Sequence, residues 1–265
     1  MFNRRELRNA VLPNRPVAMS TAFMLVALWT AGLLVTWLIL PYESLPTPRE
    51  VLAALGDLWW NQGLGPELGV TLRLIFHSLF FTVVIAMLLS YSVVIPFFRP
   101  LILAVSKLRF LGLTGLVFPF TLWTGGGYKL KVAMLTFGMV SFFVTSMAQV
   151  VLEIPRVAYD HMRVLGASEL RIVWEVVVLG TLDKALDVLR QNAAIGWALI
   201  TMVEGISRSE GGIGALILNQ NKHFKLAEVY ALLFVILAIG LALDYGMGVI
   251  IRVVCPYTVL ERVRR

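Results

Sequence analysis

Charged residues, cysteine and histidine are scarce in this chain. Only 15% of its 265 residues are charged, and it contains one cysteine and three histidines. The single cysteine, Cys255, excludes an internal disulfide and a cysteine-based metal cluster. The three histidines share no metal-ligand spacing with one another, so no metal site is expected.

Sequence signals for nucleotide binding and catalysis are also missing. The chain has no G-x-x-x-x-G-K-[ST] sequence, and its glycine runs at 125–127 and 211–214 are not followed by Lys-Ser or Lys-Thr. Loops of that kind hold the phosphates of a nucleotide, so this chain is not expected to bind ATP or hydrolyse it. No Ser/His/Asp ordering or paired carboxylates stand out either. We therefore expect neither an enzyme nor a cofactor within this chain.

Long uncharged runs dominate the sequence. Hydrophobic residues make up 58% of it, and the mean hydropathy is +0.82. These values exclude an ordinary soluble domain and predict an all-α integral membrane protein. A helix needs about 20 apolar residues to cross a hydrocarbon core of about 30 Å. The runs predict six transmembrane helices, at 17–40, 74–98, 110–128, 132–152, 185–206 and 229–251. The first follows basic residues without a small-residue cleavage site, so we interpret it as a span and not as a signal peptide.

The basic residues are distributed as membrane topology requires. With both ends in the cytoplasm, sixteen of the 23 Lys and Arg lie on the inner side and six on the outer side. This predicts a cytoplasmic basic arm at 1–16, a periplasmic loop at 41–69 and a cytoplasmic basic tail at 256–265. Residues 48–55 of the loop have the apolar spacing of a short interfacial helix. The net charge of +7 therefore reflects orientation in membrane lipid, and no basic stripe suited to nucleic acid is present.

A charged island interrupts the apolar sequence. Eleven charges lie in the 38 residues from Glu153 to Arg190, between the uncharged stretches 132–152 and 191–203. Unpaired charges are costly in hydrocarbon, so the island is expected to be a folded aqueous element. From composition alone, the simpler interpretation is a solvated hairpin that only links two spans. The alternative is a surface that another protein binds.

Local signals divide the island into two short helices. Val157–Leu165 can form two helical turns that stop at Gly166, and Ser168 can cap the next helix. Asp160 is expected near the start of the first helix, where a carboxylate suits the helix dipole. The second helix is expected to present one apolar face, made of Leu170, Val173, Trp174 and Val177.

The island and two further stretches resemble a known family. The run Asp160-His161-Met162-Arg-Val-Leu-Gly166-Ala167-Ser168 is similar to the loop motif of permease subunits from binding-protein-dependent ABC importers, with His161-Met162 in place of two alanines. Leu122-Trp123-Thr124-Gly125-Gly126-Gly127 resembles the stretch between the family's third and fourth spans. Trp197 to Ile217 is similar to its fifth span and the glycine-rich turn that follows. Within the family, the chain most resembles the nitrate/sulfonate/taurine/bicarbonate branch.

The resemblance implies a fold, partners and a site. The fold would be a type I ABC importer permease, with its core at 70–255 and a cytoplasmic coupling loop at 153–184, in a bacterial inner membrane. Two separate ATPase subunits would bind ATP and Mg²⁺, and a second permease copy or a related permease would complete the pathway. A periplasmic or lipid-anchored solute-binding protein would deliver a small anionic solute. The residues expected to couple to the ATPase are Asp160, His161, Arg163, Gly166, Ala167, Ser168 and Glu169.

Several other polar and aromatic residues are candidates for the translocation path, namely Trp123, Trp197, Thr201 and Glu204. Glu204 is either functional or a helix-stabilising partner of Arg208, one turn away. Lys129 and Lys131 attract an anionic solute or, as we favour, extend to lipid headgroups.

Two other functions remain open. A non-transporting scaffold subunit of a larger complex would explain the altered loop motif. A secondary transporter driven by an ion gradient would favour an internal repeat and several midplane ionisable residues, and neither is clear here.

Overall fold

The computed structural model describes residues 12, 17–39, 45–207 and 210–256, and within them the chain is helical without strands. The long helices are α2 (Met19–Ile39), α4 (Leu64–Tyr91), α7 (Gly127–Leu152), α10 (Leu182–Ile206) and α12 (Leu226–Val254). The shorter ones are α3 (Pro48–Trp60), α5 (Arg99–Lys107), α6 (Val117–Thr124), α8 (Arg156–Val164), α9 (Glu169–Ile172) and α11 (Ile213–Lys222). Short 3₁₀ turns lie at Ser92–Val94, Pro96–Phe98, Leu108–Phe110, Leu113–Leu116 and Leu179–Thr181, and a π-helical segment spans Val173–Val178. The predicted basic arm and tail lie outside the described residues.

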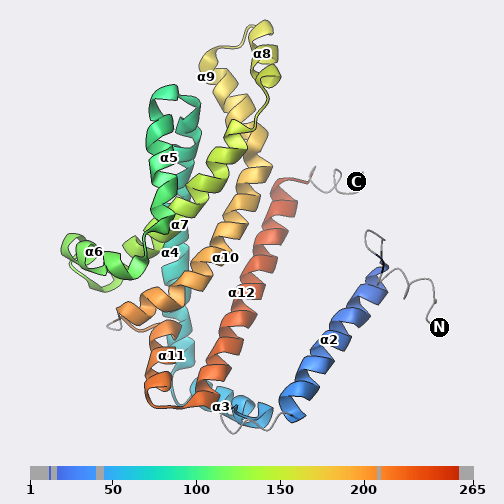
Figure 1. Ribbon diagram of the computed structural model, residues 1–265, viewed down its shortest axis with the longest axis vertical. Helices are drawn as coiled ribbons and strands as arrows, with labels where there is room; N and C mark the ends of the chain where they lie inside the picture. The colour runs from blue at the N-terminus through green and yellow to red at the C-terminus, as the bar shows by residue number, and fades with distance from the viewer. Residues whose placement is uncertain (1–11, 13–16, 40–44, 208–209, 257–265) are drawn as a thin grey trace.

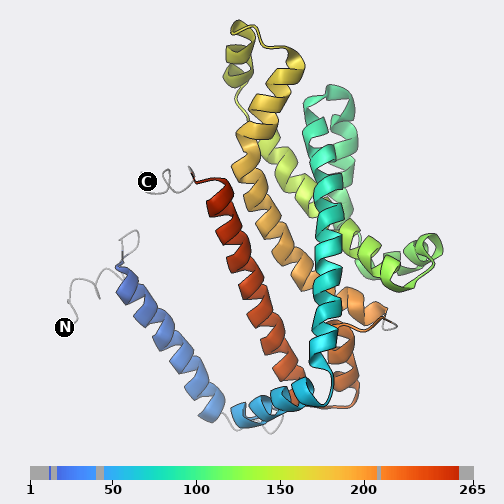
Figure 2. The same ribbon diagram turned by 180° about the vertical axis from the view of Figure 1, so that it is seen from behind.

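The bundle is elongated, with different elements at its two ends (Figure 1). One end carries α8 and α9, and we call it the α8 end. The opposite end carries α3 and α11, and we call it the α3 end. Figure 2 shows the same arrangement from behind, and in both views α2 diverges from the other long helices. At its α3 end, α2 contacts α12 through Trp37, which stacks on Phe234 with ring centroids 5.8 Å apart.

Helix α7 forms the centre of the bundle. It is the most buried of the long apolar helices, and it packs against α4 and α10. Small side chains recur every four residues on the face of α4 that is buried, at Ser78, Thr82, Ala86 and Ser90. Small residues at this spacing let two helix backbones approach closely in a membrane. The sequence thus places the tightest packing between α4 and α7.

The all-α membrane fold is confirmed, with differences in the spans. Four helices are long and apolar enough to cross a membrane, α2, α4 with Ser92–Val94, α7 and α12. A fifth span results if Pro96–Phe110 and Leu113–Thr124, which meet at a bend of 105°, are counted together. Helix α10, at 25 residues, is long enough for a sixth, but its first half carries charge.

The predicted straight span at 110–128 is wrong. The chain bends near Gly112, and α6 begins only at Val117 and ends at Thr124. Pro119 explains why α6 does not begin before Val117, because proline lacks an N–H and its ring clashes with the carbonyl four residues earlier, that of Gly115. It is therefore tolerated in the first turn of α6 but not inside a longer helix. The predicted span at 74–98 also differs, since α4 begins ten residues earlier, at Leu64, and ends at Tyr91.

The predicted loop at 41–69 contains a well-defined helix. Thr47 and Glu50 form a reciprocal capping box at the start of α3, with Pro48 as its first residue. The buried face of α3, with Val51, Ala54 and Leu58, packs on α12. The short helix expected over 48–55 is therefore present and extends to Trp60.

Candidate functional sites: the charged loop, the glycine turn and two cavities

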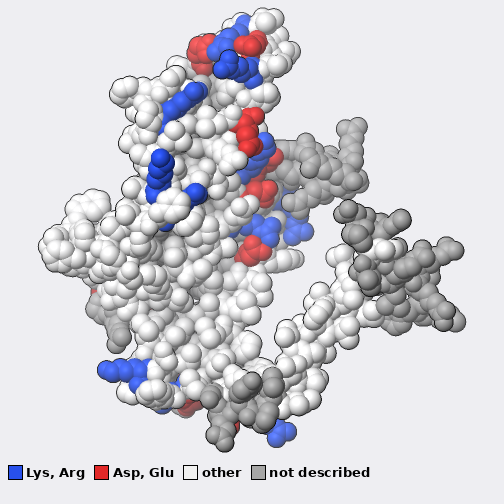
Figure 3. All heavy atoms as spheres, viewed as in Figure 1, with Lys and Arg blue, Asp and Glu red and all other residues white. Residues whose placement is uncertain are grey.

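The charged loop projects from the α8 end as two short helices joined at Gly166. Gly166 has a φ of +78°, and its N–H donates to the carbonyl of Arg163 over 2.9 Å. The Ser168 hydroxyl accepts the N–H of Arg171 and caps α9. The predicted left-handed stop and helix cap are confirmed. Figure 3 shows acidic and basic side chains gathered over this end and continuing in a line below it.

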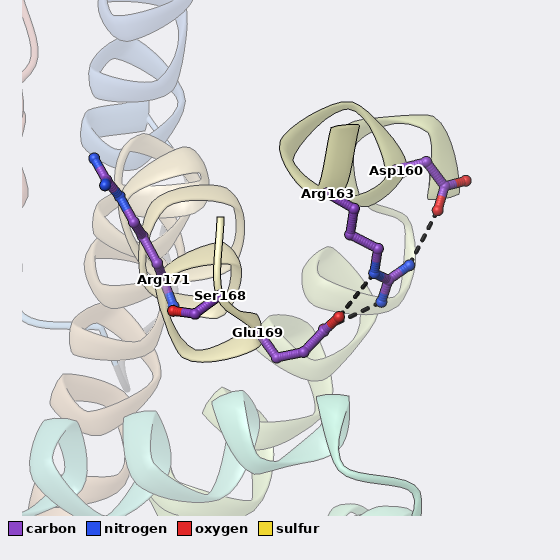
Figure 4. Close-up of polar contacts among 5 residues, drawn as sticks. All are labelled: Asp160, Arg163, Ser168, Glu169 and Arg171. Carbon is purple, nitrogen blue, oxygen red and sulfur yellow. Dashed lines mark hydrogen bonds and ion pairs between the residues drawn. The ribbon is translucent and has the colours of Figure 1, made fainter. Parts of the chain in front are cut away.

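Arg163 ties the two helices of the loop together. Its guanidinium donates to both carboxylate oxygens of Glu169, over 2.8 and 3.2 Å, and to Asp160 over 3.0 Å (Figure 4). The hydrogen bonds that Arg163 donates to Glu169 raise the pKa of Arg163 and lower the pKa of Glu169. These charges were expected to be available to a partner. They bond to each other and thereby connect α8 to α9, while all three side chains remain at least half exposed.

Two expectations for the loop are wrong. Asp160 is the fifth residue of α8 and not near its start, so its carboxylate is held by Arg163 and not by the helix dipole. The second helix presents no single apolar face. Leu170 and Trp174 are exposed while Ile172 and Val177 are buried. The reason is that α9 continues as the wider π-helical turn, which changes the angular spacing of its side chains.

The tip of the loop instead carries an exposed apolar patch. Its members are Val157, Val164, Leu165 and Leu170, which are 75%, 86%, 68% and 85% exposed. We call these four residues the tip patch. Sequence reasoning missed it, although apolar residues on both sides of a helix-stopping glycine are a usable signal. His161 is also exposed at this tip. Exposed apolar side chains rimmed by charge are typical of a protein-binding surface.

A second polar cluster lies at the turn between α10 and α11. The N–H of Gly214 donates to Glu204 over 2.8 Å, and that of Gly212 donates to Glu67. Lys131 donates to the carbonyl of Gly211 over 2.7 Å. Side chains from α4, α7 and α10 therefore bond to one short backbone segment. We call residues 211–214 the glycine turn.

The glycine turn leaves no room for larger side chains. Gly211 and Gly212 have φ values of +71° and +108°, and a Cβ on Gly212 would lie 2.3 Å from the Glu204 carboxyl carbon. A Cβ on Gly214 would lie 2.4 Å from the carbonyl oxygen of Thr201. Glycine is thus required both by backbone conformation and by close contact.

The structure resolves several sequence-level alternatives at this turn. Glu204 is fully buried and bonds Thr71 and Gly214, while its suggested partner Arg208 lies outside the described residues. Lys131 does not extend to lipid headgroups, because its side chain is fully buried and bonds Gly211. Lys129 is exposed. Glu67 and Thr71 were not foreseen as partners, since no sequence spacing links them to residues 204–214.

The candidate path residues lie in three different places. Trp197 and Thr201 line one cavity of about 560 Å³ between α4, α10 and α12. Trp123 lines another, of about 600 Å³, between α4, α6 and α7. Glu204 is buried at the glycine turn. Trp197 is fixed by a 3.0 Å hydrogen bond from its ring N–H to the carbonyl of Ile236.

An ion pair joins α10 to α12 beside the first cavity. Arg190 donates to both oxygens of Asp244, over 2.7 and 2.6 Å. An acidic residue inside an apolar run is expected from sequence to face the bundle or a neighbouring subunit, and Asp244 faces α10 of its own bundle. A paired, bidentate arrangement satisfies a carboxylate at membrane depth.

Comparisons with known proteins agree with the fold. No protein-family model matches the chain. The chain is 27% identical over 253 residues to the taurine transport system permease protein TauC of Escherichia coli (strain K12). The aligned region covers 89% of this chain and 87% of that protein. Two crystal forms of the inward-facing MetNI methionine ABC transporter contain a similar chain. The selenomethionine-soaked form matches with a TM-score of 0.60 and 22% identity, and the native form with 0.62 and 21%. Each match covers 75% of this chain and 98% of the other.

Sequence similarity along most of the chain and the shared helical fold thus agree with the motifs of the charged loop and the glycine turn. The chain is therefore a multi-pass membrane protein that is similar along most of its length to a transport system permease protein, and it has the fold of a chain of an ABC transporter.

Proposed function

We propose that this chain is the permease subunit of an ABC importer and that it imports a small anionic solute, with energy from ATP hydrolysed by a separate ATPase that binds the charged loop at 153–184. The observation that carries the proposal is the tip patch on a loop held rigid by Arg163. Asp160 and Glu169 hold that arginine, and Gly166, Ala167 and Ser168 form the turn between the helices. His161 is exposed beside the patch, available for a polar contact.

A rigid loop of this kind suits mechanical coupling. Apolar residues at the centre of a small surface supply most of the affinity in protein interfaces, with polar residues at the rim. The four residues of the tip patch are exposed on the same loop that carries the charged side chains of Asp160, Arg163 and Glu169. The loop is continuous with α10 through the π-helical segment. Movement of a bound ATPase would therefore reach a membrane-spanning helix directly.

The remaining parts of the proposal follow from charge and family. The excess of Lys and Arg on one side supports a cytoplasmic α8 end with both termini in the cytoplasm. The complete importer would contain two permeases, two ATPases that bind ATP and Mg²⁺, and a periplasmic or lipid-anchored binding protein. The taurine permease named above supports a sulfonate-like solute.

Crosslinking tests the coupling surface. A photo-crosslinking residue at Leu170, in the full importer in native membranes, is expected to capture the ATPase. The same residue at Trp60, which is 82% exposed at the α3 end, is the matched control and is expected not to. Absence of ATPase capture from Leu170 and Leu165 alike would contradict the proposed coupling.

Uptake measurements separate the proposal from its alternatives. In proteoliposomes with ATP and a collapsed ion gradient, the importer is expected to accumulate taurine, whereas a secondary transporter would not. Leu170→Asp is expected to abolish ATP-dependent uptake, and Leu170→Met to preserve it, because only the first removes apolar contact. If the chain is only a scaffold subunit, neither Leu170→Asp nor Leu170→Met should change uptake or ATPase activity.

A further inference from the structure

The cavity between α4, α6 and α7 has apolar walls and a polar rim. Its volume is about 600 Å³, within the range of small-molecule sites. The walls are largely aromatic and aliphatic, formed by Phe81, Ile85, Phe120, Trp123, Phe137 and Val140. Trp123 is 81% exposed and Phe120 packs against Phe137 with ring centroids 5.5 Å apart. The walls thus offer a wide apolar contact surface.

The rim carries positive charge and hydrogen-bond donors. Lys129 and His77 line the cavity together with Tyr128. His77 Nδ1 is 2.6 Å from the Tyr128 hydroxyl, which holds the imidazole in place. The Arg73 guanidinium lies 5.6 Å from the centre of the Tyr128 ring. Lys129 is therefore the one cationic side chain among the described lining residues, while Arg73 lies outside the lining.

No carboxylate lines this cavity. The twelve lining residues, all within the described part of the chain, include neither Asp nor Glu. Glu210 lies beside Gly127, at the start of α7, but is not among them. Clefts with charge of one sign and low-dielectric walls concentrate ions of the opposite sign. The cavity therefore complements a molecule with an anionic head and an apolar body.

We propose that this cavity binds a small organic anion, with its head at Lys129 and His77 and its body against Trp123 and Phe137. This inference rests on the proposed function, because the anion would be the transported solute. An inorganic anion such as sulfate would use the rim but leave the aromatic walls without contact. The site would therefore select organic sulfonates over sulfate. The volume favours such a solute over a membrane phospholipid, which has two long chains.

Fluorescence quenching provides a direct test. The complete importer is placed in nanodiscs of zwitterionic lipid, and 6-bromohexanesulfonate is added as a heavy-atom quencher of tryptophan. Subtracting the fluorescence of the Trp123→Phe variant from that of the wild-type protein isolates the signal of Trp123 from that of the other tryptophans. We expect saturable quenching in the wild type that is lost in Trp123→Phe. Excess sulfate is expected not to reverse it.

Variants at the rim test the role of charge. Lys129→Met is expected to weaken the apparent affinity about tenfold, because a charge-assisted contact is lost. Lys129→Arg is the matched control and is expected to stay within about threefold of the wild type, since it keeps the positive charge. Equal affinities of the Met and Arg variants would overturn the assignment of the anionic head to this residue.

Three further results would overturn the proposal. The first is that quenching does not saturate. The second is that excess sulfate displaces the sulfonate fully. The third is that a brominated anionic phospholipid quenches Trp123 and prevents the sulfonate from binding. The last result would identify a lipid site. ATP-driven uptake distinguishes this inference from the proposed function. Uptake without Trp123 quenching, and with unchanged KM in Lys129→Met, leaves the function intact and rejects the site. Quenching without ATP-driven uptake rejects the function and retains the site.

Discussion

The hydroxyl of Thr71 lies between the carboxylate of Glu204 and the backbone of the glycine turn. It donates to Glu204 Oε1 over 2.7 Å and accepts the N–H of Ile213 over 2.9 Å. Both Thr71 and Glu204 are buried, so water cannot replace either bond. One hydroxyl thus joins α4, α10 and the start of α11.

Removing this hydroxyl should destabilise the protein. Thr71→Val keeps the shape but leaves a carboxylate oxygen and an N–H without partners, at a cost of about 1–3 kcal/mol. The free energy of unfolding in detergent measures the effect. Thr30→Val is the control, because the exposed Thr30 bonds only carbonyls of its own helix, and a change within about 0.5 kcal/mol is expected there. Equal effects at the two sites would contradict the linking role of Thr71.

Adding one methyl group to the glycine turn should separate α10 from α11. In Gly214→Ala the new Cβ would lie 2.4 Å from the Thr201 carbonyl oxygen and 2.7 Å from its Cα, and a backbone cannot yield as a side chain does. We expect a loss of about 1–3 kcal/mol in the free energy of unfolding, as in other overpacked sites. Gly69→Ala in α4 is the control, with nothing within 4 Å of the added Cβ. It should be neutral or stabilising, because alanine favours the helix.

The Arg190–Asp244 pair should show strong energetic coupling. A double-mutant cycle with Arg190→Ala and Asp244→Ala is expected to give a larger coupling energy than the same cycle at Arg171 and Glu175, because the first pair is bidentate and joins two helices. The Arg171–Glu175 pair has a similar distance, 2.8 Å, but makes a single hydrogen bond on the exposed loop. A small coupling for the first pair would show that solvent reaches it freely.

Acid should loosen the charged loop. The hydrogen bond from Arg163 lowers the pKa of Glu169 in the folded loop. The unfolded loop therefore binds the proton first, at about pH 4.3, and the stabilisation by the ion pair is present above that value. It is lost as the pH falls through the lower, folded-state pKa. A nitroxide at position 165, in a Cys255→Ser background, should gain mobility over this range in electron paramagnetic resonance spectra.

Glu169→Gln provides the control for the acid effect. Its spectrum should be mobile already at pH 7 and should change little on acidification, because no carboxylate remains at position 169 and the other partner of Arg163, Asp160, lies on α8 itself. A wild-type loop whose mobility is the same at pH 7 and at pH 3 would show that the ion pair does not hold α8 to α9.

Local geometry could be predicted from the sequence where neighbouring residues determine it. Gly166 and Ser168 act within one turn of themselves, and the structure places both as expected. The span at 110–128 failed because absence of charge indicates membrane depth but not helix continuity, which Pro119 interrupts. The single apolar face predicted for α9 was wrong because nothing in the spacing of its apolar residues signals a π-helical turn.

The glycine turn could not be assembled from the sequence. Its partners come from three helices, and the contacts of Thr71 with Ile213 and of Glu67 with Gly212 each span about half the chain. Lys131 shows the limit most clearly. A lysine near the end of a span is usually explained by lipid headgroups, and only packing reveals that a backbone carbonyl holds this one. The positions of the candidate path residues likewise could not be predicted from the sequence, because Trp123 and Trp197 line different cavities in the structure.

Helix α10 is anchored to different neighbours at two points of its length. Arg190 attaches it to α12, and Glu204 attaches it to α4 through Thr71. These anchors are fourteen residues apart, about 21 Å at 1.5 Å per residue. A torque entering from the charged loop would therefore be shared among three spans. Between the two anchors, Trp197 adds a second bond from α10 to α12, so the strengths of the bonds to α12 and to α4 set which neighbour α10 follows.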